Sequence, residues 1–180
     1  MYKILKAETL AAKIHLMVVH APRVASHCQP GQFIIVKLDE KGERIPLTIC
    51  DYDREEGTIT IVFQEIGVST IKMAELKAGD AFRDFVGPLG CPSEFVEEDI
   101  EELKKKKMVF VAGGVGTAPV YPQVNGSMNM ESQQMLFLVQ KLRIWLSLRK
   151  NWEKFPIFML LQMTVPMAVQ VWLPRLLRIW

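Results

Sequence analysis

The sequence predicts an antiparallel β-barrel over residues 1–97, followed by the opening of a parallel α/β unit. Apolar and polar residues alternate through about the first 90 residues, which is the pattern of strands with one buried face. A continuous apolar run, Met108–Ala112, then leads into a glycine-rich turn, as a buried parallel strand does where it turns into a helix. Beyond Val124 neither pattern continues.

Short runs of strand-forming residues, separated by turn signals, make up the barrel region. The turn signals include Lys41-Gly42, Glu56-Gly57 and Ala78-Gly79-Asp80. The runs predicted as strands include Ile14–Val18, Phe33–Val36, Leu47–Cys50, Thr58–Phe63 and Ala81–Val86. About six short strands, hence a six-stranded antiparallel arrangement, favour a barrel or sandwich.

A helix and a connector complete the predicted elements. Thr70–Leu76 places apolar residues among polar ones directly after a pair of hydroxyl residues, which predicts a short helix that closes one end of the barrel. Phe95–Lys107 is an acidic stretch that ends in lysines, and we interpret it as a solvated connector or helix. A domain boundary at this point makes residues 98–124 the start of a nucleotide-binding domain.

Charge divides the chain at Val124. The 180 residues carry a net charge of +2, which gives no reason to expect nucleic acid binding. However, residues 1–124 hold 15 basic and 18 acidic residues, whereas residues 125–180 hold 7 and 2. All four Trp and six of the ten Met also lie in the second part. We therefore expect residues 125–180 to form an irregular or disordered tail.

The cysteines are few and widely spaced. Cys28, Cys50 and Cys91 form no C-x-x-C pair, and an odd number argues against a disulfide framework. The first residues run straight into alternation, with no apolar stretch of signal-peptide type. We expect a cytoplasmic protein without a metal site of its own.

Two clusters combine groups that suit a flavin or a phosphate. Arg44–Thr48 places an Arg, a rigid Pro and a hydroxyl before a strand, and an Arg fork with a hydroxyl suits a phosphate or a flavin edge. Gly67–Thr70 opens the predicted helix, where backbone amides and hydroxyls can bind an anion. Taken alone, the first is more often a solvated turn and the second an ordinary helix cap.

Two further clusters are rich in glycine. Gly87–Gly90 by itself marks only a turn. Gly113–Pro119 follows an apolar strand, and its glycines would let the backbone approach a dinucleotide closely. It departs from the G-x-G-x-x-G fingerprint, so a plain Rossmann dehydrogenase is not implied.

The order and spacing of these clusters, together with Pro30-Gly31-Gln32-Phe33, resemble the ferredoxin–NADP reductase superfamily. The resemblance is closest to its electron-transfer subunits: the small subunit of NADH-dependent reduced ferredoxin:NADP oxidoreductase, also described as sulfide dehydrogenase, and next the dihydroorotate dehydrogenase electron-transfer subunit. Arg44–Asp53 and Gly113–Gln123 carry it most clearly. It covers residues 1–124.

The resemblance implies a flavoprotein with a six-stranded FAD-binding barrel and a Rossmann-like domain. It implies that the flavin is lined by Arg44, Pro46, Leu47, Thr48 and Ile49, with its pyrophosphate at Gly67, Ser69 and Thr70. It implies NAD(P)H at Gly113, Gly114, Gly116, Thr117 and Ala118. Electrons would pass from NAD(P)H through FAD to a [2Fe–2S] cluster and a larger flavin and iron–sulfur partner subunit. Cys50 could touch the flavin, but a buried apolar thiol is the simpler interpretation.

The family pattern stops at Val124. A helix, further parallel strands and a late cysteine cluster should follow, and the sequence contains none of them. Read one base out of phase, the tail yields forced residues of the family's kind: Met128-Asn129 gives Glu, Met163-Thr164 gives Asp and Met167-Ala168 gives Gly. We hypothesise that one base is missing just after Val124, so that this chain is impaired and retains flavin affinity alone.

Alternative interpretations of the tail remain open. Residues 155–174 contain no charged residue and have the length of a membrane span, although polar residues and Pro166 within them argue against one. The tail could instead be an amphipathic partner-binding segment. The corresponding alternative function is a flavin- or ligand-binding barrel without redox activity, tethered to a membrane.

Overall fold

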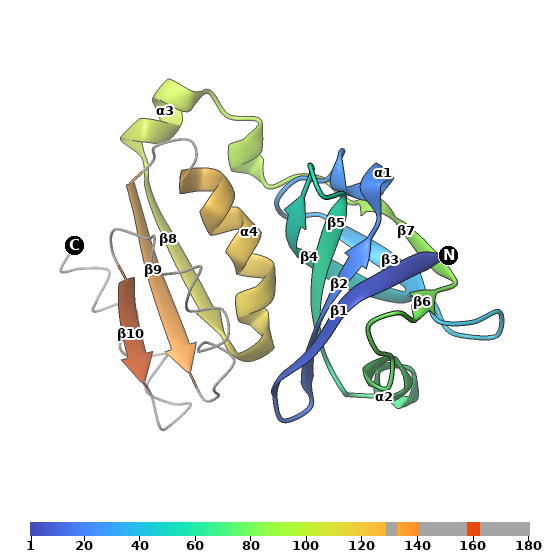
Figure 1. Ribbon diagram of the computed structural model, residues 1–180. Coiled ribbons are helices and arrows are strands. Elements are labelled where there is room, and N and C mark those ends of the chain that lie inside the picture. The colour runs from blue at the N-terminus through green and yellow to red at the C-terminus, as the bar shows by residue number, and fades with distance from the viewer. Residues whose placement is uncertain (129–132, 141–157, 163–180) are drawn as a thin grey trace.

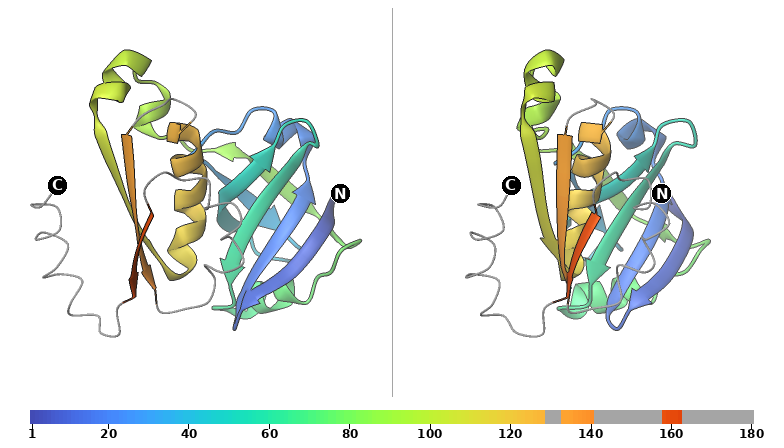
Figure 2. Two further views of the ribbon diagram at one scale, coloured as in Figure 1. Left: turned by 60° about the vertical axis from the view of Figure 1, so that its left-hand side comes forward. Right: turned by 90° about the vertical axis from the view of Figure 1, so that its left-hand side faces the viewer.

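The computed structural model describes residues 1–128, 133–140 and 158–162. A β-barrel forms the N-terminal part, and a three-stranded parallel sheet lies beyond a connector. Helix α4 (Thr117–Met128) lies between that sheet and the barrel, as the views in Figures 1 and 2 agree. The order of elements follows the sequence prediction: a barrel first, then a parallel α/β unit.

Seven strands form the barrel, in the order β6-β1-β2-β5-β4-β3-β7, and all their pairings are antiparallel. The strands are β1 (Tyr2–Ala11), β2 (Ile14–His20), β3 (Phe33–Lys37), β4 (Ile45–Asp53), β5 (Thr58–Gln64), β6 (Ala81–Phe82) and β7 (Asp84–Leu89). A short helix, α1 (Pro22–Ala25), follows β2. The edge strands β6 and β7 are separated by one residue, so the sheet is nearly closed.

The prediction of six strands is wrong by one, and the difference lies at Arg83. The single run predicted over Ala81–Val86 is divided there, because β6 pairs with β1 and β7 pairs with β3 at the opposite edge of the sheet. The Arg83 N–H donates to the Lys37 carbonyl at 2.9 Å. A strand that crosses from one edge to the other must bend, and alternation alone does not reveal the bend.

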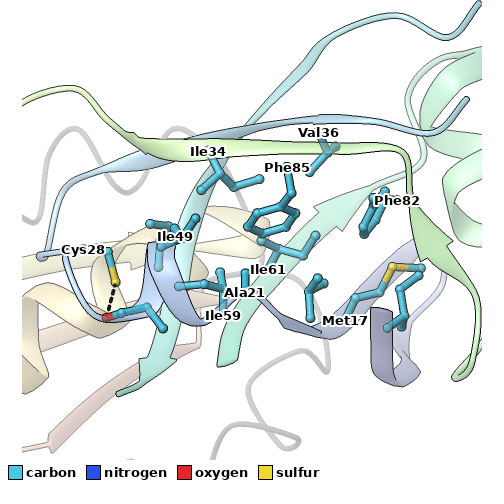
Figure 3. Packing of buried hydrophobic residues seen from close by; sticks show 14 of the residues in the cluster. Met17, Ala21, Cys28, Ile34, Val36, Ile49, Ile59, Ile61, Phe82 and Phe85 are labelled. Atoms are coloured by element: carbon cyan, nitrogen blue, oxygen red, sulfur yellow. Dashed lines mark hydrogen bonds between the residues drawn. The ribbon is translucent and has the colours of Figure 1, made fainter. Parts of the chain in front are cut away.

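Inward-facing residues of the strands form the barrel core. Ile34, Ile59 and Ile61 have no exposed surface, and Phe82 and Phe85 meet with ring centroids 6.2 Å apart. Figure 3 shows these side chains pointing toward one another from opposite strands, with Met17 at one side. Burying an aliphatic or aromatic side chain of this kind contributes about 1.5–3 kcal/mol, so this core positions the outward-facing residues of the same strands.

Helix α2 (Val68–Ala74) begins two residues before the predicted Thr70. Gly67 is the N-cap, and the Thr70 hydroxyl oxygen accepts hydrogen bonds from the backbone N–H groups of Ile66 and Gly67, at 2.9 and 3.0 Å. The pattern predicted a hydroxyl residue as the cap, and Thr70 is one, but it acts from the third position of the helix and not from the position before it. This is the reaching-back half of a capping box.

The connector contains a 3-10 turn, η1 (Glu94–Val96), and helix α3 (Ile100–Lys105). Asp99 caps α3, because its carboxylate accepts from the N–H groups of Glu101 at 2.9 Å and Glu102 at 3.3 Å. Acidic residues in the first turn and lysines in the last complement the helix dipole. Leu103 is the buried residue of this helix.

The second sheet is parallel, in the order β10-β9-β8. Its elements are β8 (Lys107–Gly113), the 3-10 turn η2 (Gly114–Gly116), α4, β9 (Gln133–Gln140) and β10 (Phe158–Gln162). The end of α4 and the strands β9 and β10 differ from the expected irregular tail. The apolar run Met135–Val139 has the composition of a buried parallel strand. A Rossmann-like domain stays a prediction, because the described residues supply three strands.

Most of residues 125–180, and most of the segment 155–174, lie outside the described residues. Inside that segment, Phe158–Gln162 is strand β10, which pairs in parallel with β9. Within the described part of the chain, no helix is long and apolar enough to cross a membrane.

Helix α4 packs against the outer surface of the barrel. Tyr121 and Val124 of α4 form a buried cluster with Cys50 of β4 and Val62 of β5. The Ser93 hydroxyl donates to the Gln123 side-chain oxygen at 2.8 Å. This junction fixes the glycine turn that precedes α4 beside the barrel.

Candidate cofactor-binding site

Alternate residues at the start of β4 form an exposed stripe on the outer face of the barrel. Arg44, Pro46 and Thr48 are exposed, whereas Leu47 between them is partly buried and packs against the barrel core. Successive side chains of a strand point to opposite faces. The first predicted cluster therefore presents a guanidinium, an apolar ring and a hydroxyl along one line.

Ile49 is placed differently from the other predicted flavin-lining residues. Its side chain is 1% exposed and lies in the barrel core, as Figure 3 shows. A β-bulge follows, because Ile49 pairs with Ile61 but Asp51 pairs with Thr60. Cys50, next to the inward-facing Ile49, points outward into the junction with α4, where it is also 1% exposed. The Ile49 N–H donates to the Gln32 carbonyl at 3.1 Å, so neither this group nor the buried side chain is offered to a surface ligand.

An apolar bed flanks the exposed stripe. On the neighbouring strand β3, Phe33 pairs with Thr48 and Ile35 pairs with Pro46, and both apolar side chains are partly exposed. Val86 of β7, the partner of Ile35, is 42% exposed. Such a surface suits a flat aromatic ring system, since ligand sites are mostly apolar with a few placed polar groups. The sequence prediction did not include Phe33, Ile35 or Val86 among the flavin-lining residues. Phe33–Val36 is apolar throughout, so only strand geometry, which places Phe33 and Ile35 on one face, could have indicated them.

Arg44 is available to an anionic ligand. Its guanidinium is 61% exposed, and its Nη2 atom lies 3.9 Å from the Asp84 carboxylate of β7. A contact this long between exposed groups contributes little to stability, and it occupies little of a guanidinium that has five donors. The geometry therefore leaves Arg44 able to bind a phosphate or the polar edge of a ring.

The start of α2 lies beside this stripe. The Ser69 hydroxyl donates to the carboxylate of Glu43, the residue that precedes Arg44. Nothing lies within 4 Å of the position that a Cβ atom would take on Gly67. The structure thus brings the first and second predicted clusters together, and it gives Ser69 and Thr70 hydrogen-bond partners within the protein.

The third cluster, Gly87–Gly90, is a packing element. A Cβ on Gly87 would lie 2.6 Å from the Ile34 Cγ2 atom, and one on Gly90 would lie 3.0 Å from the ring of Phe33. The Gln32 side-chain amide donates to the Gly90 carbonyl at 2.9 Å. Gly87, Pro88 and Leu89 belong to strand β7, so the interpretation of the cluster as a turn is wrong for three of its four residues, and the segment packs beside Phe33.

The fourth cluster forms the turn from β8 into α4. Gly114 has a φ of 57°, which glycine adopts without strain, and a Cβ on either Gly114 or Gly116 would meet nothing within 4 Å. Gly113 is exposed. Thr117 and Ala118 are buried, with 6% and 3% exposure. The open glycine backbone, and not the Thr117 or Ala118 side chain, is the accessible part of this cluster.

The glycines divide into packed and open positions, and this division tests the fit of a dinucleotide. Gly31, Gly57, Gly87 and Gly126 would place a Cβ within 3.0 Å of another residue. Gly67, Gly79, Gly114 and Gly116 face open space, so protein packing does not require them. Gly79 lies in the turn before β6, and the other three belong to the clusters for which the sequence predicted a nucleotide. An unobstructed backbone there is what a bound pyrophosphate needs.

The glycine turn and the stripe lie on neighbouring strands. Turn η2 contacts β5, which pairs with β4, and Val115 of the turn packs against the cluster that contains Cys50 and Val62. The fourth cluster therefore lies against β5, the neighbour of the strand β4 that carries Pro46 and Thr48.

The cysteines do not converge. Burial raises the pKa of the Cys28 thiol to about 11 and that of the Cys50 thiol to about 12, while Cys91 is exposed. Among residues 1–128, 133–140 and 158–162, no three His, Cys, Asp or Glu side chains lie close enough together to hold a metal ion. These cysteines therefore do not fit an iron–sulfur cluster.

Comparisons with known proteins show which sequences this chain resembles. No family model matches it. It is 64% identical over 124 residues to an uncharacterised protein of Clostridium beijerinckii, and the aligned segment covers 69% of this chain and 42% of that protein. It is 41% identical over 120 residues to the dihydroorotate dehydrogenase B electron transfer subunit homologue of Thermotoga maritima, covering 67% and 40%. The chain thus spans about two fifths of the length of these relatives.

Two solved structures have a fold similar to that of this chain. The NADH-dependent reduced ferredoxin–NADP oxidoreductase structure is 31% identical, with a TM-score of 0.78, covering 89% of this chain and 56% of that one. Phthalate dioxygenase reductase has a TM-score of 0.69 at 18% identity, covering 92% and 52%; this likeness shows the fold alone.

The fold defines a class: the chain has a ferredoxin reductase-like fold. Over 120 residues it is homologous to a protein named as a dihydroorotate dehydrogenase electron transfer subunit homologue, and over 98 residues to one named as such a subunit. The family resemblance expected from the motifs is confirmed.

Proposed function

We propose that this chain is an electron-transfer flavoprotein subunit that binds FAD on the outer face of β4 and NAD(P)H at the turn before α4. A single observation carries the proposal. The exposed stripe of Arg44, Pro46 and Thr48, on its apolar bed, meets the open backbone of Gly67 through the Ser69–Glu43 hydrogen bond. When bound, FAD supplies the exchange between hydride chemistry and single-electron transfer.

Residues of the stripe bind and orient the flavin in this proposal. Arg44 donates hydrogen bonds to an anionic or carbonyl oxygen, and Thr48 donates or accepts at the ring edge. Pro46 supplies apolar contact, while Leu47 and Ile49 support the strand from its inward face. Phe33 and Ile35 form the bed beneath the ring and exclude water from one of its faces.

The pyrophosphate lies at Gly67, Ser69 and Thr70. The missing side chain of Gly67 lets the backbone approach the phosphate oxygens. Ser69 reaches them by giving up its bond to Glu43, and the freed carboxylate repels the phosphate, which limits the gain from this contact. Thr70 contributes mainly by holding the N–H groups of Ile66 and Gly67.

The nicotinamide nucleotide binds the backbone of Gly113, Gly114 and Gly116, and the buried Thr117 and Ala118 fix the start of α4 behind it. A larger flavin and iron–sulfur subunit receives the electrons, and this chain supplies no cluster ligands from its described residues. Because the family pattern changes after Val124, reduction by NAD(P)H is impaired more than flavin binding.

Titration of FAD into the purified protein tests this proposal. Arg44→Ala should weaken FAD binding by roughly 10- to 100-fold, because a hydrogen bond to a charged group contributes about 1.5–3 kcal/mol. Arg23→Ala is the matched control, since Arg23 is exposed on α1, and α1 packs at the β4–β5 turn, the end of β4 opposite Arg44. Flavin fluorescence quenching gives the affinities. A folded, colourless wild-type protein that leaves FAD fluorescence unchanged contradicts the proposal.

A further inference from the structure

The segment that carries Gly67 has little support of its own. Helix α2 has seven residues, and Met73 is its one buried residue. Helices of this length are not stable by themselves in water. Ile66 and Val68 on either side of Gly67 are 82% and 71% exposed. The position of Gly67 must therefore come from attachments at the ends of this segment.

Glu65 provides the attachment on the upstream side. Its backbone N–H donates to the Lys13 carbonyl in the β1–β2 hairpin at 2.9 Å. Its carboxylate lies 2.6 Å from the Nε2 atom of His15 on β2. A carboxylate only accepts, so Nε2 carries the hydrogen of this bond. Backbone and side chain of Glu65 thus bind the same hairpin.

His15 is itself held in place. It pairs across the sheet with Phe63, on which its ring stacks with centroids 5.4 Å apart. Its Nδ1 atom lies 3.3 Å from the Thr9 hydroxyl. The His15 and Glu65 side chains are 13% and 25% exposed, so water screens their contact less than a surface ion pair. The hairpin therefore presents a fixed donor to Glu65.

We infer that His15 and Glu65 are positioning residues for the Gly67–Thr70 segment and, through it, for the FAD pyrophosphate. Neither touches the cofactor site. Glu65 lies two residues before Gly67, and the N–H groups of Ile66 and Gly67 both bond to Thr70. A displacement at Glu65 is therefore transmitted directly into the capped start of α2. The consequence for FAD rests on the proposed function, whereas the ordering of the segment does not.

Hydrogen exchange in the FAD-free protein tests the ordering. Glu65→Ala should speed exchange of the Ile66, Gly67 and Ile71 amides on the order of tenfold, the effect of losing one such bond. Glu65→Gln, which keeps an acceptor for the His15 Nε2–H, should stay close to wild type. Glu8→Ala is the control, because Glu8 lies on the same hairpin in an exposed pair with Lys6. Unchanged exchange in Glu65→Ala overturns the inference.

FAD affinity measured on the same variants tests the functional part. Glu65→Ala should weaken binding on the order of tenfold, with rescue in Glu65→Gln and no change in Glu8→Ala. The double variant His15→Ala/Glu65→Ala should lose no more than the larger single loss, because the residues act through one contact. Equal FAD affinity in all variants overturns it. If the wild type binds no FAD while exchange responds as expected, the proposed function fails and the ordering role stands.

Discussion

At the scale of single residues, Asp51 on β4 combines a carboxylate with a half-buried position. Burial raises the pKa of its carboxyl above the ordinary 3.8, against the lowering effect of the hydrogen bond from the Tyr52 N–H. A raised carboxyl pKa means that the folded state disfavours the charge. This contribution to stability is largest below pH 3.8 and is lost as the pH rises through the folded pKa.

Asp51→Asn should therefore raise the melting temperature at pH 7, because the amide oxygen keeps the Tyr52 N–H and removes the buried charge. The gain should vanish near pH 3, where the wild-type carboxyl is protonated in both states. Asp39→Asn serves as the control: Asp39 is exposed and also accepts one backbone N–H, from Lys41. Calorimetry at both pH values measures the difference, and a stabilisation that is equal at pH 3 and pH 7 contradicts it.

The three thiols should differ in reactivity. Cys91 is exposed, whereas burial holds the pKa values of Cys28 and Cys50 at about 11 and about 12, against an ordinary 9.0. Because the thiolate is the reactive form, maleimide at pH 7.5 should label the native protein once. Cys91→Ser should remove that label, and denaturant should expose all thiols. More than one label on the native wild type contradicts this prediction.

The same thiols affect stability at high pH. Unfolded thiols ionise near pH 9.0, before the folded ones at about 11 and about 12. The unfolded state then binds fewer protons, so the free energy of unfolding should fall as the pH rises from 9 toward 12. Urea titrations of wild type and Cys50→Ala across this range measure the effect, and equal slopes with pH for the two proteins contradict it.

Only some of the predicted flavin-lining residues are exposed, and strand geometry explains why. Strand geometry places Pro46 and Thr48, with Arg44 just before the strand, on one exposed face of β4, and their contact with a cofactor stays a prediction. Ile49 was included because the motif is a run of consecutive residues, which covers both faces of the strand. The bulge at Cys50 was also hidden, since bulges depend on the partner strand β5 and on packing against α4.

At the scale of elements, some glycines are required for packing, whereas others leave the backbone open to a ligand. Gly87→Ala would force a Cβ within 2.6 Å of the Ile34 Cγ2 atom, so it should destabilise the barrel by roughly 1–3 kcal/mol. Gly116→Ala meets nothing within 4 Å and has no left-handed φ, so its stability should stay within about 0.5 kcal/mol of wild type. Urea unfolding compares the two, and equal losses contradict the division of glycines.

Elements were predictable where the cause is local. The capping of α2 and the acidic start of α3 follow from neighbouring residues, so their approximate positions were correct. The division of Ala81–Val86 into β6 and β7 depends on two partners distant in sequence, β1 and β3, and no local pattern encodes it. Strands β9 and β10 were not expected, because residues 125–180 are rich in Met and Trp and poor in acidic residues, and the apolar run Met135–Val139 within them is short.

At the scale of the whole molecule, the junction between barrel and α4 sets the relation of the two proposed cofactor sites. Cys50 and Val62 come from the barrel, and Tyr121 and Val124 from α4. Their convergence depends on contacts between residues far apart in the sequence: Tyr121 is 59 positions after Val62, and Val124 is 74 positions after Cys50. The sequence could therefore predict a boundary near residue 97 and could not predict this interface, which holds the glycine turn beside β5.

The change at Val124 leads to the last prediction, which concerns the gene. Identity to the Clostridium beijerinckii protein extends over 124 residues, the length of the segment before the charge balance and the Met and Trp content change. A missing base in a Lys AAA codon just after Val124 accounts for both facts. DNA sequencing across this position should show the additional base, and an intact frame without a family-like continuation in the other phase contradicts it. With the base restored, the protein should bind NAD(P)H more tightly than this chain while its FAD affinity changes little, because the Arg44 and Gly67 clusters lie before the break.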